Sequence, residues 1–393
     1  MRSLAFALAL IPATALADPW EWGGRNTDFP PAFPQQFRAD LVDSGVPLSM
    51  QVLATDLEHP WGIATLPGDQ GWLVTERPGR LRHLAADGTL SGPISGLPEV
   101  VAARQGGLLD VALDPDFAQN RVIYVTYAKP VQGGSATAAA RMVLAADMSA
   151  VSDVQDIFVQ TPASRNPMHF GSRIAFLRDG TLAITTGEHF SRRERVFAQD
   201  LDKTYGKVVR VTRDGNIPSN NPFVGQDGAD PSIWSYGHRN IQGAAVDGSG
   251  TLWTIEHGPA GGDELNRPEA GRNYGWPVIS YGRNYNTSAV GSGAAVREGM
   301  EQPVYFWDPV IAPGGMAFHS GRAFGEWNGD ILASSLNPGG LVRLSLDGSG
   351  RVETEERLLT DLGRIRDVEV QPDGTFIVLT DFEDGQVIHV TPG

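Results

Sequence analysis

Short stretches with alternating apolar and polar residues recur along the whole chain, and they come in pairs joined by a turn signal. Each pair has an apolar stretch, then a turn containing Asp-Gly, Asn-Gly or Pro-Asp, and then a second β-rich stretch. Asp-Gly between two alternating stretches is a strong signal for a β-hairpin. The pattern therefore predicts antiparallel hairpins throughout, with no amphipathic helix of useful length.

This strand–turn–strand phrase occurs six times, in units of roughly 45–75 residues. A third strand often follows, as at residues 80–84, 341–346 and 386–390. Radial repetition of small sheets is one way in which an all-β chain protects its edge strands. We therefore predict an all-β fold, a six-bladed β-propeller with mostly four-stranded antiparallel blades, over residues 46–393. Tandem β-sandwiches are the alternative, but they would not explain the sixfold recurrence.

The first 45 residues do not follow this pattern. Residues 1–17 have a positive start at Arg2, an apolar run over residues 4–11 and a small-x-small cleavage site at residues 15–17, which together predict a secretory signal peptide. The apolar run is too short to span a bilayer. Residues 18–45 are rich in Pro, Trp and Phe and are expected to form an irregular N-terminal extension. We expect a soluble exported protein, located in the periplasm if the source is a Gram-negative bacterium.

Composition narrows the range of functions. The chain of 393 residues has no cysteine, so it forms neither disulfides nor a thiolate metal site. Its formal net charge of −15 disfavours nucleic acids and anionic membranes as partners. No apolar segment suggests membrane insertion, no pattern suggests a dimer, and a monomer is the default. The chain has no glycine-rich dinucleotide fingerprint and no P-loop, which argues against a nucleotide-dependent enzyme.

Polar groups cluster just before the first strand of several units. In a propeller these loops meet around the central channel, so we expect the groups to converge. They include the three arginines Arg239, Arg364 and Arg366. Guanidinium groups bind planar carboxylates bidentately, so their convergence predicts a small ligand with several carboxylates. Taken one at a time, each arginine could equally form a surface ion pair.

His169 is a candidate general base in one of these loops. Glu188 follows the return strand of the same hairpin and should come back close to His169. A carboxylate in that position can orient an imidazole and stabilise its protonated form. A purely structural histidine is the alternative. Ser172 lies nearby, but no Gly-x-Ser-x-Gly motif surrounds it, so a serine nucleophile is disfavoured.

The stretch 257–266 is polar and rich in glycine, and it follows a good strand at residues 251–255. We expect an irregular loop here rather than a strand. Asp263, Glu264 and the amide of Asn266 supply oxygen atoms of the kind that calcium prefers. A solvated turn whose acidic side chains face water is the alternative.

Taken together, these motifs resemble the soluble aldose sugar dehydrogenases of the glucose/sorbosone dehydrogenase family, which depend on calcium and pyrroloquinoline quinone (PQQ). The matching segments are spread over nearly the whole mature chain, in the family's order. They are residues 59–62, 105–109, 169–173, 236–240, 256–259, 262–264, 273–277 and 364–367. The resemblance implies a six-bladed propeller, in agreement with the repeat pattern.

The resemblance also implies roles for individual residues. His169, assisted by Glu188, would remove the proton of the anomeric hydroxyl while hydride passes to PQQ. The positions that match PQQ contacts are Gln105, Arg239, Asn240, Arg364 and Arg366. The carbonyl groups of Gly258 and Pro259 would bind the calcium ion at the quinone. Glu264, with carbonyl groups near Tyr274 and Tyr285, resembles a second, structural calcium site.

One position departs from the family pattern. Where the family usually has a lysine that contacts the quinone, this chain has Asn337. Asparagine can donate a hydrogen bond to the cofactor but brings no positive charge. The leading expectation is a PQQ- and calcium-dependent aldose dehydrogenase that forms a lactone and passes electrons to an external acceptor. A calcium-dependent lactonase and a non-catalytic sugar- or protein-binding propeller remain as alternatives.

Overall fold

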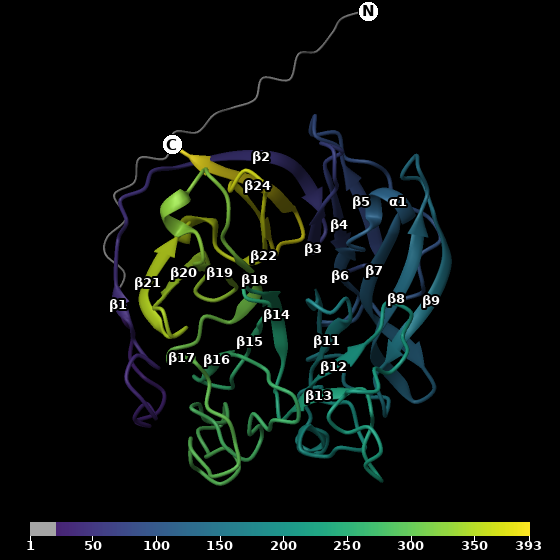
Figure 1. Ribbon diagram of the computed structural model, residues 1–393. Helices are drawn as coiled ribbons and strands as arrows, with labels where there is room; N and C mark the ends of the chain where they lie inside the picture. The colour runs from purple at the N-terminus through teal and green to yellow at the C-terminus, as the bar shows by residue number, and fades with distance from the viewer. Residues whose placement is uncertain (1–20) are drawn as a thin grey trace, which may run out of the picture.

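The computed structural model describes residues 21–393, and the predicted signal peptide lies outside this range. Six small sheets are arranged around a central axis (Figure 1). The inner strand of each sheet contacts the inner strands of its two neighbours, so that the six strands form a closed ring. The predicted six-bladed β-propeller is therefore confirmed. None of the helices described in this range has the length and apolar character needed to cross a membrane.

Each blade begins with its inner strand. In chain order the inner strands are β3 (Pro60–Thr65), β6 (Leu108–Leu113), β10 (Gly171–Phe176), β14 (Ile241–Val246), β18 (Pro313–Phe318) and β22 (Ile365–Val370). The strands that follow them are β4 (Trp72–Glu76) and β5 (Arg80–Leu84); β7 (Val122–Val131), β8 (Gly134–Leu144) and β9 (Val151–Val159); β11 (Leu182–Thr186), β12 (Lys207–Val211) and β13 (Ile233–Tyr236); β15 (Leu252–Glu256), β16 (Asp263–Asn266) and β17 (Tyr305–Trp307); β19 (Ile331–Ser335), β20 (Leu341–Leu346) and β21 (Val352–Leu358); and β23 (Phe376–Thr380) and β24 (Gly385–Pro392). The helices described are short: α1 (Phe117–Asn120), η1 (Arg195–Ala198), η2 (Gly325–Trp327) and η3 (Thr360–Leu362).

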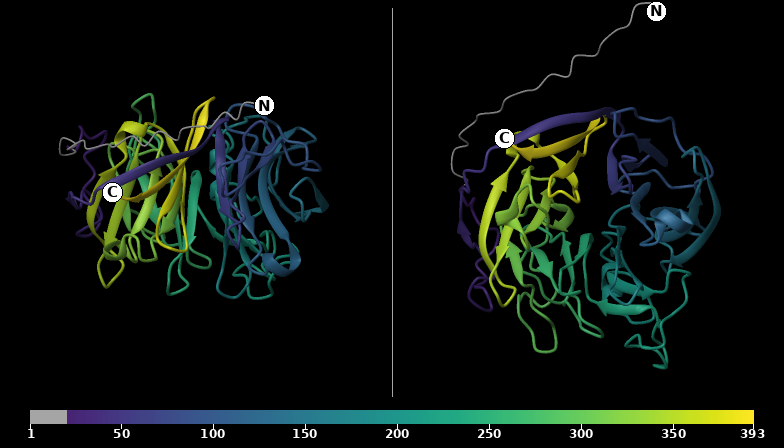
Figure 2. Two further views of the ribbon diagram at one scale, coloured as in Figure 1. Left: turned by 90° about the horizontal axis from the view of Figure 1, so that it is seen from above. Right: turned by 45° about the horizontal axis from the view of Figure 1, so that its top comes forward.

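The ring is closed by strands from opposite ends of the chain. Strand β2 (Leu48–Leu57) pairs antiparallel with β24 and completes the last blade (Figure 2). The first blade has three strands, and the fifth gains the short parallel strand β1 (Asp40–Leu41) against β21. The other four blades have four strands each, as expected. Most of the described part of the N-terminal segment is irregular; the backbone amides of Asn26 and Thr27 are anchored on the carboxylate of Asp308.

The core is divided among the blade interfaces. A separate cluster of buried apolar side chains fills the space between each pair of neighbouring blades. This arrangement follows from the period-2 pattern, because a strand inside a blade presents apolar side chains to a neighbouring blade on each face. The site residues described below therefore rest on rigid, fully packed strands.

The inner strands share an irregularity close to their first residues. In every inner strand the pairing register shifts near its start, as between Gly171 and Ile174 in β10 and between Ile365 and Asp367 in β22. A bulge re-aims the side chains around it and increases the local twist. The bulges lie at the end of the channel where the polar loops meet.

The expected irregular loop over residues 257–266 is wrong in its second half, where residues 263–266 form strand β16. Asp263 is fully buried and its carboxylate accepts backbone N–H groups from Gly258 (2.7 Å), Ile311 (2.9 Å) and Ala312 (2.7 Å). Three backbone donors satisfy this carboxylate, so a polar residue can lie inside the sheet. Asp263 therefore organises the loop and is not a free metal ligand.

Candidate active site

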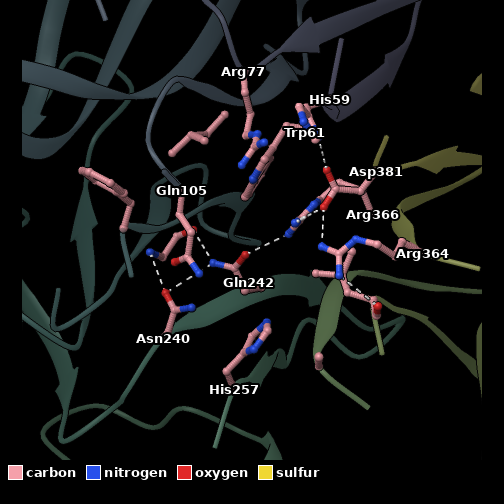
Figure 3. A pocket seen from close by; sticks show the side chains of 15 residues that line it. His59, Trp61, Arg77, Gln105, Asn240, Gln242, His257, Arg364, Arg366 and Asp381 are labelled. Carbon is pink, nitrogen blue, oxygen red and sulfur yellow. Dashed lines mark hydrogen bonds and ion pairs between the residues drawn. The ribbon is translucent and has the colours of Figure 1, made fainter. Parts of the chain in front are cut away.

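A cavity of about 440 Å³ opens where the loops meet at one end of the channel. Its lining residues come from all six blades. Figure 3 shows this cavity from close by, with ten of the lining residues labelled. The residues that line it are His59, Trp61, Arg77, Gln105, Leu109, Phe170, Gly171, Asn240, Gln242, His257, Ala312, Leu336, Arg364, Arg366 and Asp381. Of the predicted cofactor-binding residues, Gln105, Asn240, Arg364 and Arg366 line this cavity directly.

One wall of the cavity carries the predicted arginines around a buried carboxylate (Figure 3). Arg364 and Arg366 each donate to Asp381 Oδ2 at 2.7 Å, and His59 Nδ1 lies 2.9 Å from Asp381 Oδ1. Burial alone would raise the pKa of Asp381, but the two guanidinium groups outweigh it and hold this pKa well below its ordinary value. Arg77 adds a third guanidinium group to the same cavity. One carboxylate therefore faces three arginines, and the wall keeps a positive excess.

Several guanidinium nitrogens near this cavity have no partner. The Nε atoms of Arg77, Arg239 and Arg366 are buried and make no hydrogen bond within the described part of the chain. Buried donors are normally satisfied, so unpaired ones need an explanation. An anionic, oxygen-rich ligand held in the cavity would supply the missing acceptors.

The opposite side of the cavity is lined by side-chain amides. Gln105 Oε1 accepts the backbone N–H of His169 at 2.8 Å, and Asn240 Oδ1 accepts the backbone N–H of Gly171 at 3.0 Å. Gln242 Nε2 donates to the Gly171 carbonyl at 3.0 Å, and its Oε1 accepts from Arg366 at 3.1 Å. These amides fix the turn before β10 and link it to the arginine wall.

The predicted pair of His169 and Glu188 forms. His169 Nδ1 lies 2.7 Å from Glu188 Oε1, and both side chains are buried. Burial, with Arg239 adding to it, lowers the pKa of His169 well below its usual value. With Glu188 ionised, Nδ1 carries the proton and the lone pair on Nε2 is free to accept one. His169 also has a positive φ of 48°, a strained conformation that is typical of functional positions.

Activity should depend on pH through Glu188. Burial raises the pKa of this carboxyl to about 7, although Arg239, His189 and Arg195 oppose the shift. Below that pH Glu188 takes up a proton and no longer stabilises a protonated His169, so the kcat/KM of any reaction that uses His169 as its base should fall as pH drops through about 7. Glu188→Gln should lower kcat/KM and remove this transition from the pH profile. An unchanged profile in the variant would assign the titration to another group.

A second cavity of about 250 Å³ lies beside the first. It is lined by Glu188, Phe190, Arg192, Arg195, Arg239, Pro259, Trp276, Asn284, Tyr285 and Asn286. Phe170 and Gly171, which follow His169 in the chain, line the first cavity. Glu188, the hydrogen-bond partner of His169, lines the second. The His169–Glu188 pair therefore sits at the boundary between the two. Arg239, expected beside Arg364 and Arg366, lies in the wall of the second cavity.

The predicted metal ligands are divided between two places. Pro259 lines the second cavity and follows the buried Gly258. Among the described residues, no hydrogen bond ends on the carbonyl oxygen of either residue. Arg239 Nη1 donates instead to the carbonyl of His257 at 3.0 Å. The two free carbonyl oxygens at the edge of the cavities suit a hard cation.

Glu264 lies in a separate acidic cluster inside the fourth blade. It stands opposite Glu256 in the β15–β16 pairing and accepts from Asn266 Nδ2 at 3.2 Å. Burial, then Glu256, raises the pKa of Glu264 well above its usual value, and Asn266 Oδ1 is buried without a partner. The unpartnered Asn266 Oδ1 beside the Glu264 carboxylate is the kind of oxygen pair that suits a cation. Tyr274 stacks on His238 at 4.6 Å, whereas the side chain of Tyr285 is exposed beside Phe190.

Asn337 lies at the rim. Its side chain is exposed, and it follows Leu336, which lines the first cavity and whose carbonyl accepts from Arg364 at 3.1 Å. No described hydrogen bond involves the Asn337 side chain, although its backbone N–H donates to Ile311 at 3.3 Å. Position 337 is therefore adjacent in the chain to the cavity wall, on its exposed side.

The sequence analysis missed Arg77, Gln242 and Asp381, and it found no acidic partner for His59 or His238. His238 Nδ1 lies 2.9 Å from Glu256 Oε1, but this pair lines neither cavity and supports the loop before β14. Arg77 and Asp381 directly follow the second strand of their blades, the strand that returns to the cavity. Glu188 was predicted because a residue just after the second strand of a blade returns to the loops before the inner strand. The same reasoning applied to every blade would have predicted Arg77 and Asp381.

Comparisons with known proteins agree with this geometry. A sequence model described as Glucose / Sorbosone dehydrogenase matches residues 57–389. Aldose sugar dehydrogenase YliI of Escherichia coli (strain K12) is 44% identical over 349 residues, covering 88% of this chain and 93% of that protein. The apo-form crystal structure of the soluble aldose sugar dehydrogenase from Escherichia coli superposes with a TM-score of 0.84 at 44% identity, covering 88% of this chain and 100% of that one. The PQQ-bound form of an aldose sugar dehydrogenase from Streptomyces coelicolor gives a TM-score of 0.69 at 28% identity, with coverages of 88% and 99%. The chain therefore belongs to the glucose/sorbosone dehydrogenase family of sugar-oxidising enzymes.

Proposed function

We propose that this protein is a PQQ- and Ca²⁺-dependent aldose dehydrogenase, which oxidises the C1 hydroxyl of a sugar to the lactone and passes the electrons to an external acceptor. The observation that carries the proposal is the pair of adjoining cavities with the His169–Glu188 pair at their boundary. One cavity has an excess of arginines with unpaired nitrogens. This arrangement suits an anionic cofactor on one side of the base and a substrate on the other.

PQQ carries three carboxylates, and the first cavity offers matching donors. Arg364, Arg366 and Arg77 would face the carboxylates, while Gln105 and Asn240 would contact the polar edge of the ring system. The apolar side chains of Trp61, Leu109 and Phe170 would cover its faces. Gly258 and Pro259 would bind one calcium ion at the cofactor, and Glu264, with carbonyl groups of Tyr274 and Tyr285, would bind a second. When bound, PQQ supplies a two-electron acceptor for the hydride that leaves C1.

The chain's own contribution to the reaction is proton transfer and positioning. His169 Nε2 accepts the proton of the C1 hydroxyl, and Glu188 holds the resulting imidazolium through Nδ1. Arg239, in the wall of the second cavity, has its guanidinium 5.1 Å from the ring of Trp276. The deep placement of the pair excludes water from the base. Export through the signal predicted at residues 1–17 would place this activity in the periplasm.

The first experiment is a titration of calcium-loaded apoprotein with PQQ, followed by quinone absorbance, with a calcium-free sample as control. Glucose and an electron-accepting dye are then added. Stoichiometric binding that requires calcium, followed by sugar-dependent dye reduction, is the expected result. Absence of binding at micromolar PQQ would overturn the proposal. Hydrolysis of a sugar lactone without PQQ would then favour a lactonase, and its absence a binding protein.

Restoring a lysine at the rim should strengthen cofactor binding. Asn337→Lys adds a positive charge beside Leu336 and Arg364, and a charge-assisted hydrogen bond to a PQQ oxygen should tighten Kd by about 10- to 100-fold. Asn328→Lys is the matched control, because Asn328 is also exposed in the fifth blade but belongs to the turn after η2. Equal affinity of Asn337→Lys and wild type in the same titration would show that position 337 does not face the cofactor.

A further inference from the structure

The second cavity combines aromatic rings with an unusual concentration of positive charge. Phe190 and Tyr285 are 42% and 64% exposed, and their ring centroids lie 6.0 Å apart. Trp276 forms another wall of the same cavity. Exposed aromatic rings around a small hollow are typical of a ligand site. At about 250 Å³ the cavity suits a ligand of monosaccharide size.

Three guanidinium groups, those of Arg192, Arg195 and Arg239, line this cavity together with one carboxylate, Glu188. That carboxylate already faces His169. Within the described part of the chain, none of the three arginines forms an ion pair closer than 4.0 Å. Burial lowers the pKa of Arg195; Glu188 opposes this shift, while Arg192 and Arg239 add to it. The cavity is therefore locally cationic in a chain whose formal net charge is −15.

One of these arginines, Arg195, is held in place by its neighbours. Arg195 Nη1 donates to Asn284 Oδ1 at 2.9 Å, and its guanidinium lies 5.7 Å from the ring of Trp276. Arg195 also begins η1, where Lys207 Nζ donates to the carbonyls of Phe197 and Ala198 at 2.9 Å each. A fixed guanidinium loses little entropy on binding an anion. The first cavity has Asp381 as a counter-ion, but a neutral sugar would leave this second set of charges uncompensated.

We propose that the second cavity selects anionic aldoses, namely hexuronic acids, whose carboxylate lies against Arg192 and Arg195 while the C1 end of the sugar faces His169. This inference rests on the proposed function and specifies its substrate class. Arginine forks bind a carboxylate bidentately, and the neighbouring rings of Phe190 and Trp276 can pack on the apolar face of a pyranose. The two arginines thus determine specificity, whereas His169 and Glu188 serve any aldose.

The test compares glucuronate and galacturonate with glucose and galactose in the PQQ- and calcium-loaded enzyme. The hexuronates should show a kcat/KM at least about tenfold higher, the lower limit for a charge-assisted hydrogen bond. Arg192→Gln and Arg195→Gln should each lower kcat/KM for hexuronates about tenfold more than for the neutral sugars. Arg193→Gln is the matched control, because Arg193 is an exposed neighbour that lines neither cavity.

A binding measurement separates this proposal from the dehydrogenase function. Isothermal calorimetry of the calcium-loaded protein without PQQ should detect glucuronate, weakened by salt and by Arg192→Gln, and should give a much weaker signal with glucose. If no sugar supports dye reduction, the dehydrogenase function fails while calorimetry still decides the anion preference. Equal kcat/KM values for acidic and neutral sugars in the wild type would overturn the inference. The inference would also be overturned if Arg192→Gln lowered kcat/KM equally for acidic and neutral sugars and raised the KM for an anionic dye. That result would assign the arginines to binding of the electron acceptor.

Discussion

Replacing His169 by alanine should reduce sugar oxidation by a factor of about 10²–10⁴, the usual contribution of a positioned general base. The C1 hydroxyl would then have no neutral imidazole to accept its proton, and Glu188, held at the far side of that ring, could not replace it. PQQ binding to the calcium-loaded protein should change little, because the His169 side chain is not part of the lining of the first cavity. Steady-state dye reduction and the PQQ titration measure the two quantities separately.

His83→Ala is a suitable control, because His83 lies on β5 at the edge of the first blade. Within residues 21–393 its ring forms a hydrogen bond only with the carbonyl of Gln70. Its turnover should equal that of the wild type. Turnover of His169→Ala within tenfold of the wild type would exclude His169 as the base. His257 would then become the strongest candidate, since its imidazole lines the first cavity and burial lowers its pKa well below the usual value.

The predictions that succeeded concern features that are local in the chain. The six hairpins could be predicted because each inner strand and its partner are separated by a short turn with Asp-Gly or a similar signal. The contact between His169 and Glu188 could be predicted for the same reason, because Gly171 pairs with Thr186 in one hairpin. Pairing of β2 with β24 joins residues more than 300 positions apart and leaves no comparable local pattern.

The details of the site depended on information that a single sequence does not contain. The three arginines were expected to face one anionic ligand. Instead, Arg364 and Arg366 already donate to the carboxylate of Asp381, which supplies part of the negative charge expected from the ligand. The division into two cavities, with Arg239 in the second, arises from loops of several blades that approach one another only in the folded chain. The positive charge of the loop at residues 190–195 indicates a ligand site only because the folded chain places this loop in one cavity with Trp276 and Tyr285.

Arg173 is the buried residue whose loss should destabilise the fold most. It lies in β10, inside the channel beneath the first cavity, and donates to Asp110 at 2.9 Å and to Asp367 at 3.1 Å. Its Nε donates to the carbonyl of Gln242, and its guanidinium stacks 4.5 Å from the ring of Trp61. One side chain thus connects five of the six inner strands. Two carboxylates share this single cation, so its removal would leave two buried charges without compensation.

Arg173→Met should therefore lower the free energy of unfolding by about 3–5 kcal/mol, the range for breaking a buried ion pair from one side. The loss should increase with pH. Burial already raises the pKa of Asp110 to about 6 despite Arg173, and Asp367 is shifted in the same direction. A carboxyl whose pKa is higher in the folded state than in the unfolded state makes folding less favourable as pH rises. Without Arg173 both pKa values should rise further, so the variant should be closer to the wild type at pH 5 than at pH 8.

Urea unfolding of both proteins at pH 5 and pH 8 measures this difference. Arg178→Met provides the matched control, since Arg178 is exposed at the other end of the same hairpin. Among the residues that the structure describes, its side chain donates only to the carbonyl of Ser249. This control substitution should change the free energy of unfolding by no more than about 0.5 kcal/mol at either pH value. If Arg173→Met lowers the free energy of unfolding only slightly, or equally at the two pH values, then Asp110 and Asp367 are neutralised without the arginine. The positive charge in the channel would then add nothing to the stability of the propeller.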